Sequence, residues 1–178
     1  GHAAADELDY QPNRAARGLI TGRSTAIAII VPDLTNSYYA NICRAGQSLA
    51  RARGYEVFIA ESVDGAREAE LVASVSRWAE GVVLCSSAHE YDPRPFGVPI
   101  VSVNREMAGS HCVVVDPASM VCQQIDHLLA LGHEQIDWVA GPARDWSAGP
   151  RRAAAERFAA QHDIRILTAG GVGFDSGV

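Results

Sequence analysis

The sequence predicts an α/β fold, a doubly wound parallel sheet with helices on both faces. Short apolar runs of strand length alternate along the chain with longer segments whose apolar residues recur every three or four positions, as on one face of a helix. The apolar runs are continuous, which is typical of strands buried on both faces. Strands that alternate with helices in this way form parallel sheets through crossover connections.

The first strand is predicted over residues 25–31, because Thr25-Ala-Ile-Ala-Ile-Ile-Val31 is apolar and ends at Pro32-Asp33. The helix after it carries apolar residues at helical spacing from Tyr39 onward and is closed by Gly54. A second helix begins near Asp64-Gly65, and a third is capped by Asp116 and stopped by Gly132. The other predicted elements are strands over 55–60, 81–85, 98–103, 112–115, 135–140 and 164–167 and a helix over 150–161.

Composition and charge exclude several classes of protein. Hydrophobic residues make up 48% and charged residues 20% of the 178 residues, as in ordinary globular chains. The longest apolar run, Ala26 to Val31, is too short to cross a bilayer, and no secretory signal precedes it, so we expect a cytoplasmic protein with no membrane partner. The net charge of -6 argues against nucleic-acid binding by the whole surface.

The sequence offers little support for catalysis. No phosphate loop, GxGxxG motif after the first strand, GxSxG elbow or HExxH pair is present, so we expect neither an enzyme nor a bound cofactor. Cys43, Cys85, Cys112 and Cys122 lack metal-ligand spacing, and no metal site is expected. We interpret these cysteines as reduced thiols of the core.

Polar and aromatic side chains follow the strands at the carboxyl edge of the predicted sheet, where ligands of such folds bind. Hydrogen-bonding and stacking groups without a nucleophile suit a polyhydroxylated or planar polar ligand. Alternative roles are open for some of them, since Asn36-Ser37 can cap the first helix, Tyr39 lies on its apolar stripe, and Arg151 can pair with Asp145. The candidate ligand-binding residues are Asn36, Tyr38, Tyr39, Ser86, His89, Asn104, Arg105, Trp146, Ser147 and Arg151.

Several segments, in this order and spacing, resemble the lac-repressor/galactose-repressor family of transcription regulators. They are Ile-Ile-Val-Pro-Asp-Leu-Thr-Asn-Ser-Tyr-Tyr-Ala (29–40), Glu-Gly-Val-Val-Leu (80–84), Val-Pro-Ile-Val-Ser-Val-Asn-Arg (98–105), Leu-Ala-Leu-Gly-His (129–133) and Ala-Gly-Pro (140–142), followed by Trp-Ser (146–147) and Arg151. The resemblance runs from about residue 3 to 178. It implies a periplasmic-binding-protein-like fold of two lobes and repression of transcription in response to a small, sugar-like effector.

The resemblance also implies a division of the chain. Residues 1–23 would be the end of a DNA-binding headpiece and a hinge, 24–141 the first lobe of the effector-binding domain, and 142–178 the beginning of an incomplete second lobe. By resemblance, the segment from Asn13 to Leu19 would form a short helix on operator DNA. Ala16 and Leu19, three residues apart, would share one face, with Leu19 wedged into the minor groove.

The resemblance further implies a homodimer whose hinge segments fit or misfit the operator according to the arrangement of the lobes. Two rival interpretations stay open. A solute-binding receptor for sugar uptake would share the fold but lack the hinge-like residues, and an α/β enzyme acting on sugars or nucleotides would turn over its ligand.

Overall fold

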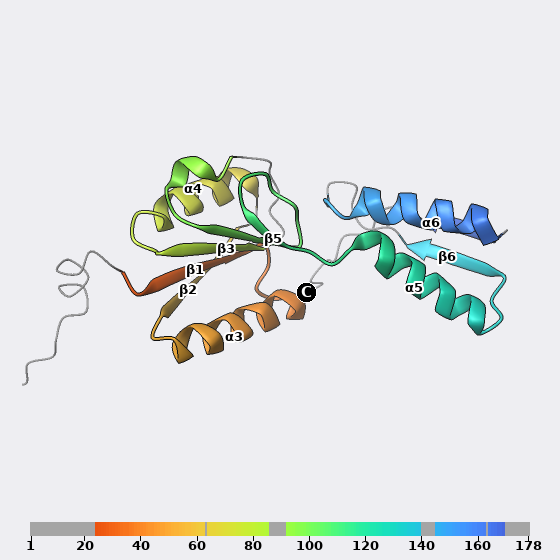
Figure 1. Cartoon of the computed structure of the whole chain (residues 1–178), viewed down its shortest axis with the longest axis horizontal. Coiled ribbons are helices and arrows are strands. Elements are labelled where there is room, and N and C mark those ends of the chain that lie inside the picture. Colours follow the sequence, from red (N-terminus) through yellow and green to blue (C-terminus); the bar gives the residue numbers. More distant parts are fainter. Residues whose placement is uncertain (1–23, 63, 86–91, 140–144, 163, 170–178) are drawn as a thin grey trace, which may run out of the picture.

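The computed structural model describes residues 24–62, 64–85, 92–139, 145–162 and 164–169, and they form two lobes (Figure 1). The predicted order of strands and helices is confirmed, with boundaries within two or three residues at most ends. Among the described residues, no helix combines the length and apolar character needed to span a membrane.

The first lobe is a five-stranded parallel sheet in the order β2-β1-β3-β4-β5. This order places the first strand in the interior and is that of a doubly wound sheet. Its elements are β1 (Ala26–Val31), α3 (Ser37–Ala52), β2 (Glu56–Glu61), α4 (Gly65–Val75), β3 (Gly81–Cys85), the short 3-10 helix η1 (Arg94–Phe96), β4 (Ile100–Val103) and β5 (His111–Val113).

Alternation along β1 places α3 and α4 on opposite faces of this sheet, as Figure 1 shows. Ala28 and Ile30 join the cluster that contains Val72 and Val75 of α4. Ile29 and Val31 point the other way, into a cluster with Cys43 of α3 and with Cys85. All four β1 side chains are almost fully buried. Successive side chains of a strand point to opposite faces of the sheet, and both faces are covered here. An unbroken apolar run is therefore needed.

Helix α3 lies close to the sheet because of one glycine. A Cβ placed on Gly46 would lie 2.7 Å from Cδ1 of Ile29 on β1. The missing side chain allows the helix and strand to pack closely, and it keeps the start of α3 next to the end of β1.

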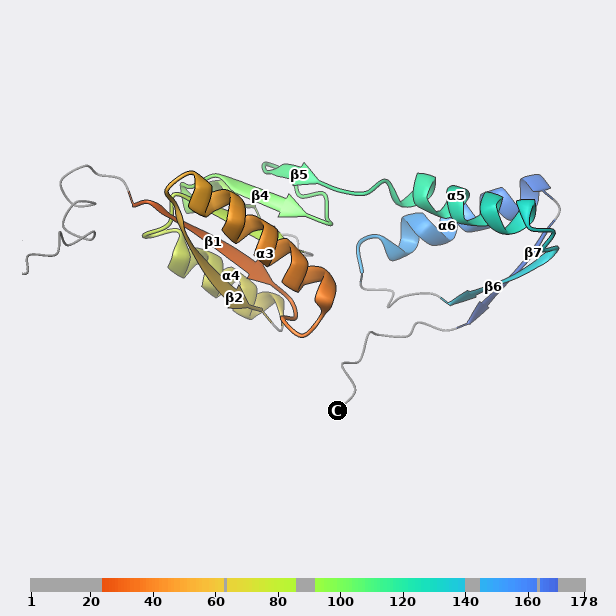
Figure 2. The ribbon, with the colours of Figure 1, turned by 90° about the horizontal axis from the view of Figure 1, so that it is seen from below.

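The second lobe contains α5 (Pro117–Ala130), β6 (Gln135–Val139), α6 (Ala148–His162) and β7 (Arg165–Ala169). Strands β6 and β7 pair in parallel, and both helices lie on the same side of them (Figure 2). A separate core holds these elements together, formed by Val121, Ile125, Ile136, Ala154, Ala155 and Phe158.

This second core corrects the boundary predicted from the sequence. The first lobe was expected to extend to residue 141, but α5 and β6 pack against α6, so the change of lobe falls between β5 and α5. The sequence pattern is the same on both sides of this point. An amphipathic helix and a buried strand have the same sequence pattern whichever sheet they join. Only their packing shows to which lobe they belong.

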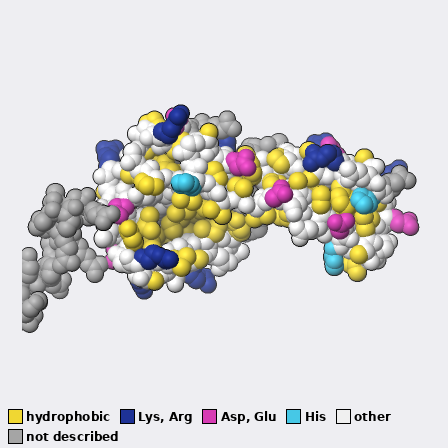
Figure 3. Space-filling view, in the orientation of Figure 1, with side chains coloured by type: hydrophobic (Ala, Val, Ile, Leu, Met, Phe, Trp, Pro, Cys, Tyr) yellow, Lys and Arg dark blue, Asp and Glu magenta, His cyan; other side chains and the backbone are white. Residues whose placement is uncertain are grey.

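An apolar band crosses the first lobe between α3 and β5 (Figure 3). Val113 on β5 and Val115 just after it are each about 60% exposed. Helix α3 packs against β1 and β2, whereas Val113 and Val115 at β5 stay largely exposed. A parallel sheet normally has both faces covered. The apolar band is the part of this sheet that the described residues leave uncovered.

The cysteines differ in their accessibility. Cys43 and Cys85 are buried as predicted, but Cys112 is exposed and Cys122 is only half-buried. The interpretation of all four as core thiols is therefore wrong for Cys112, because β5 lies at the edge of the sheet. Its Sγ accepts a hydrogen bond from the backbone N–H of Met107, at 3.2 Å.

Alkylation by iodoacetamide at pH 8 is expected to modify Cys112 first and to leave Cys43 and Cys85 unmodified until the protein unfolds. Burial raises the pKa of Cys85 to about 12, and desolvation also raises the pKa of Cys43, so burial disfavours the reactive thiolate at both positions. Mass spectrometry of timed digests measures the order. Modification of Cys85 as fast as Cys112 in the folded protein would contradict it.

Candidate functional site

The candidate site is built at the ends of strands. In both views the carboxyl ends of β1 and β4 lie on the side of the first lobe that faces the beginning of α6 in the second lobe (Figures 1 and 2). The carboxyl ends of parallel strands lie at the same edge of the sheet, so the loops that follow them lie close together even when they are distant in sequence. The predicted site residues are therefore described loop by loop.

The loop between β1 and α3 is held by its own side chains. Oδ1 of Asp33 accepts hydrogen bonds from the backbone N–H and the hydroxyl of Thr35, at 2.7 and 2.6 Å. The hydroxyl hydrogen bond is the largest cause that lowers the pKa of Asp33, so its carboxylate stays charged. Asn36 is the N-cap of α3, and its Oδ1 accepts from the backbone N–H of Tyr38 at 3.0 Å. The amide oxygen of Asn36 is thus used for capping, as the alternative interpretation held.

Tyr38 and Tyr39 have different surroundings. Tyr38 is 45% exposed at the start of α3. Tyr39 is half-buried and packs against the cluster of Ile29, Val31, Cys43 and Cys85. The two rings meet edge to face with their centroids 5.2 Å apart. Tyr39 therefore belongs mainly to the core and supports Tyr38, whose ring has free surface on which a ligand can stack.

The loop after β4 makes a sharp turn. Asn104 has a φ of 67°, the only left-handed non-glycine residue among those described. Asparagine tolerates this conformation better than most residues. Its backbone N–H donates to the carbonyl oxygen of Val113 at 2.9 Å, which extends the pairing of β4 with β5. The next residue, Arg105, turns back towards the protein and is only 7% exposed.

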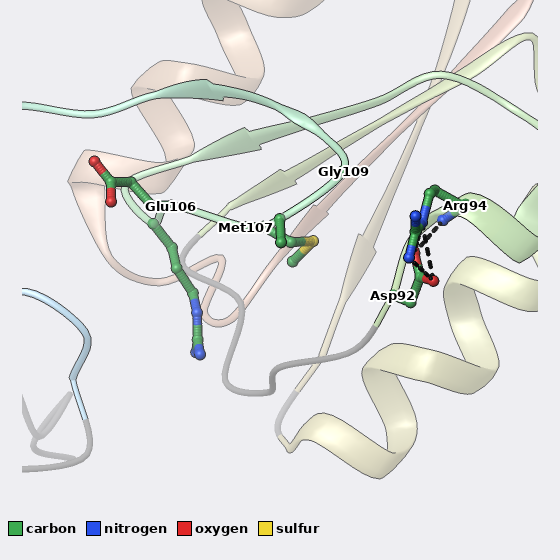
Figure 4. A pocket seen from close by; sticks show the side chains of 7 residues that line it. Asp92, Arg94, Glu106, Met107 and Gly109 are labelled. Atoms are coloured by element: carbon green, nitrogen blue, oxygen red, sulfur yellow. Dashed lines mark hydrogen bonds and ion pairs between the residues drawn. The ribbon is translucent and has the colours of Figure 1, made fainter.

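Arg105 lines a cavity of about 530 Å³ that also contacts Met107, Ala108 and Gly109 (Figure 4). On the other side of the cavity, Asp92 and Arg94 form a bidentate ion pair with N–O distances of 2.8–3.0 Å. The Arg94 guanidinium is the main cause that lowers the pKa of Asp92. The cavity thus combines an apolar floor at Met107 with charged groups at its rim, which is the composition of small-molecule sites.

In the second lobe the predicted residues surround the start of α6. Trp146 and Ser147 are half-buried, and the carbonyl oxygen of Ser147 accepts from the backbone N–H of Arg151 at 3.1 Å. Arg151 occupies the first turn of α6, where the positive end of the helix dipole disfavours a cation.

The Nε atom of Arg151 is buried and finds no hydrogen-bond partner within the described part of the chain. No ion pair joins Arg151 to Asp145 within the part of the chain that is described, so the alternative interpretation of this arginine lacks support. Buried donors in folded proteins are nearly always satisfied, and one that is not requires an explanation. An acceptor supplied by a bound molecule is such an explanation.

Five of the predicted residues lie outside the described residues. Ser86 and His89 fall in 86–91, and the predicted DNA-contacting residues Asn13, Ala16 and Leu19 fall in 1–23. For these residues the sequence-based expectation stands as it was made.

Two features of the site were missed by sequence reasoning. The ion pair of Asp92 and Arg94 is signalled only by an Asp-Pro-Arg turn, which is common in loops. The buried Ser102 looks like an ordinary strand residue within Ile-Val-Ser-Val, although a hydroxyl in an otherwise apolar strand needs a partner.

Comparisons with known proteins agree with this architecture. Residues 24–168 match the family described as periplasmic binding proteins and sugar binding domain of LacI family. The transcriptional regulator PtxS of Pseudomonas aeruginosa is 31% identical over 146 residues, covering 78% of this chain and 43% of PtxS. The regulator CelR of Thermobifida fusca is 30% identical over 194 residues, covering 98% of this chain and 57% of CelR.

Among solved structures, the Lac repressor bound to ONPG superposes with a TM-score of 0.78 at 22% identity, covering 96% of this chain and 55% of the repressor. This likeness concerns the fold, which is periplasmic-binding-protein-like, as predicted. The chain spans about half the length of the curated relatives it matches.

Proposed function

Since this chain belongs to the family of periplasmic binding proteins and LacI-type sugar-binding domains, we propose that it is the effector-binding part of a transcription repressor that senses a small, sugar-like molecule. The single observation that carries the proposal is the buried Nε of Arg151, which has no acceptor among the residues that the structure describes. A ligand hydroxyl or carboxylate satisfies this donor, and a guanidinium can give two parallel hydrogen bonds to adjacent oxygens.

The other groups complete a site for binding without chemistry. Tyr38 offers an exposed aromatic face from the first lobe, and Trp146 lies next to the helix that carries Arg151. Sugars are held in this way, by stacking on aromatic rings and by hydrogen bonds to their hydroxyl groups. Arg105 contributes from the cavity of the first lobe. We assign no nucleophile or general base, and we propose that the protein is not an enzyme.

The proposed mechanism uses the two lobes. A ligand held between Tyr38 and Arg151 contacts both lobes and favours the arrangement in which both contacts are made. The ligand shifts the equilibrium between the two arrangements of the lobes only by the difference between its affinities for them. In a homodimer, the segment with Asn13, Ala16 and Leu19 transmits that shift to operator DNA. A protein that binds operator DNA works in the cytoplasm.

The names of the relatives favour this proposal over a solute-binding receptor, which the same family description includes. PtxS and CelR are both named transcriptional regulators of the helix-turn-helix type. Operator binding by the whole protein discriminates the two, because a transport receptor has no DNA site.

The test is a thermal-shift panel on the whole protein with a neutral pentose (D-ribose), a neutral hexose (D-glucose), a sugar acid (D-gluconate) and a sugar phosphate (D-fructose 1-phosphate). A sugar present at 100 times its dissociation constant stabilises the folded protein by about 2.7 kcal/mol. We expect one of the four to raise the melting temperature and to change operator affinity. A panel with no stabilising member would contradict the sugar-like effector.

Leu19→Ala in the whole protein is expected to weaken operator binding and to leave effector affinity and melting temperature nearly unchanged. A leucine wedged into the minor groove unstacks a base step and bends the duplex, which brings more protein surface into contact with the DNA. Alanine is too short to be wedged in this way. Fluorescence anisotropy with labelled operator measures the affinity. A matching loss of thermal stability would show instead that Leu19 is an ordinary buried residue.

A further inference from the structure

The turn that carries Asn104 and Arg105 depends on a fully buried hydroxyl group. Ser102 is 0% exposed, and its Oγ donates a hydrogen bond to the carbonyl oxygen of Arg105 at 2.8 Å. It lies two residues after Ile100, whose side chain belongs to the cluster on the α4 face. The hydroxyl is therefore surrounded by apolar groups, where a lost partner is costly.

Hydrogen bonds hold the 102–105 turn at both ends. Ser102 holds the carbonyl of Arg105, and Val113 accepts from the backbone N–H of Asn104. Between these two hydrogen bonds, Asn104 adopts its left-handed conformation with a φ of 67°. A non-glycine residue stays in this region only when its surroundings hold it there. The Ser102 hydroxyl is a side-chain group that bonds directly to this turn.

We propose that Ser102 is a positioning residue for the effector site, acting through the backbone of Arg105. Its hydroxyl fixes the turn and thereby sets the direction in which the Arg105 guanidinium leaves the backbone into the cavity of about 530 Å³. The proposal rests on the proposed function, in which that cavity contributes to binding of the sugar-like molecule. Ser102 itself is fully buried, so its influence passes through the turn alone.

The chain contains a matched control. Ser62 is also buried, at 5% exposure, and its Oγ donates to a backbone carbonyl, that of Asp64, at 2.9 Å. Ser62 follows β2, at the outer edge of the sheet, and it is not part of the 102–105 turn. Replacing either serine by alanine removes the same kind of hydrogen bond, so a general loss of stability is common to both variants.

The first experiment measures hydrogen exchange of the Asn104 amide by NMR. Ser102→Ala is expected to speed this exchange at least tenfold relative to the wild type, because the amide bonded to Val113 loses the turn that aligns it. Ser62→Ala is expected to leave it unchanged. Equal exchange in Ser102→Ala and the wild type overturns the proposal.

The second experiment measures affinity by calorimetry for whichever of D-ribose, D-glucose, D-gluconate and D-fructose 1-phosphate binds the wild type most tightly. We expect Ser102→Ala to bind it about 5- to 20-fold more weakly and Ser62→Ala to bind it normally. In the Arg105→Ala background, Ser102→Ala should add little, since its effect acts through Arg105. Additive losses would overturn the positioning role.

The two experiments separate this inference from the proposed function. If the wild type binds none of the four sugars, the proposed function fails, and exchange of the Asn104 amide still decides whether Ser102 holds the turn. If the wild type and Ser102→Ala bind equally well, the proposed function stands and the inference is wrong.

Discussion

Arg151→Ala is expected to abolish measurable effector binding while the protein stays folded. The Nε of this arginine is buried and has no hydrogen-bond partner among the described residues, so this donor is open to a ligand acceptor. Truncating a buried charged contact typically costs about 2–5 kcal/mol in binding. The affinity of the best-binding sugar should therefore fall at least about thirtyfold, and the repressor should keep its effector-free response.

Arg152 is the control for this experiment. It is the next residue of α6, and its Nε forms an exposed ion pair with Glu156 at 2.8 Å. Arg152 lies about 100° around the helix from Arg151, and its side chain is exposed. Arg152→Ala should leave effector affinity within a factor of two, because exposed ion pairs contribute little. Calorimetry showing unchanged affinity in Arg151→Ala would remove Arg151 from the site.

Phe158→Ala is expected to unfold the second lobe in preference to the first. The core of the second lobe is small, and Phe158 is its only buried aromatic residue among those described. The ring also stacks on the imidazole of His162, with centroids 4.1 Å apart. Removing a buried phenylalanine typically costs about 3–5 kcal/mol. Among the described residues the two lobes share no cluster of buried side chains, so this loss falls mainly on one of them.

Hydrogen exchange followed by mass spectrometry tests this expectation. Peptides of α5 and α6 should exchange faster in Phe158→Ala, while peptides of β1 and β3 keep their protection. Leu84→Ala is the mirror control, because Leu84 is fully buried in the cluster on the α4 face of the first lobe. Faster exchange throughout the molecule in either variant would show that the lobes unfold as one cooperative unit.

Most of the fold was predictable because its signals are local. The continuous apolar run of β1, the cap at Asp116 and the glycines after α3 and α5 each act within a few residues, and each strand and helix predicted between residues 25 and 167 is observed. The lobe boundary was not predictable in the same way. Whether α5 packs against the first sheet or the second depends on its packing with α6, which is distant along the chain and which no local pattern encodes.

The candidate site was predictable to a similar extent. The rule that ligands bind at the carboxyl ends of parallel strands selected Tyr38, Arg105 and Arg151 as candidates, and they stay predictions: Tyr38 is exposed, Arg105 lines a cavity and Arg151 has a buried Nε. The rule does not separate ligand contacts from structural roles at the same edge. Asn36 caps a helix and Tyr39 packs on the core, and both roles depend on the direction of a side chain. Ser102 was missed because its partner is a backbone atom.

The three tryptophans of the chain are divided between the lobes in a way that makes each lobe optically distinct. Trp78 lies in the first lobe with its ring edge to face against Phe58, at a centroid distance of 4.7 Å. Trp138 packs on the core of the second lobe, and Trp146 precedes the helix that carries Arg151. With Trp78→Phe and Trp138→Phe together, Trp146 is the one tryptophan left in the chain, and its emission becomes a spectroscopic reporter of events beside Arg151.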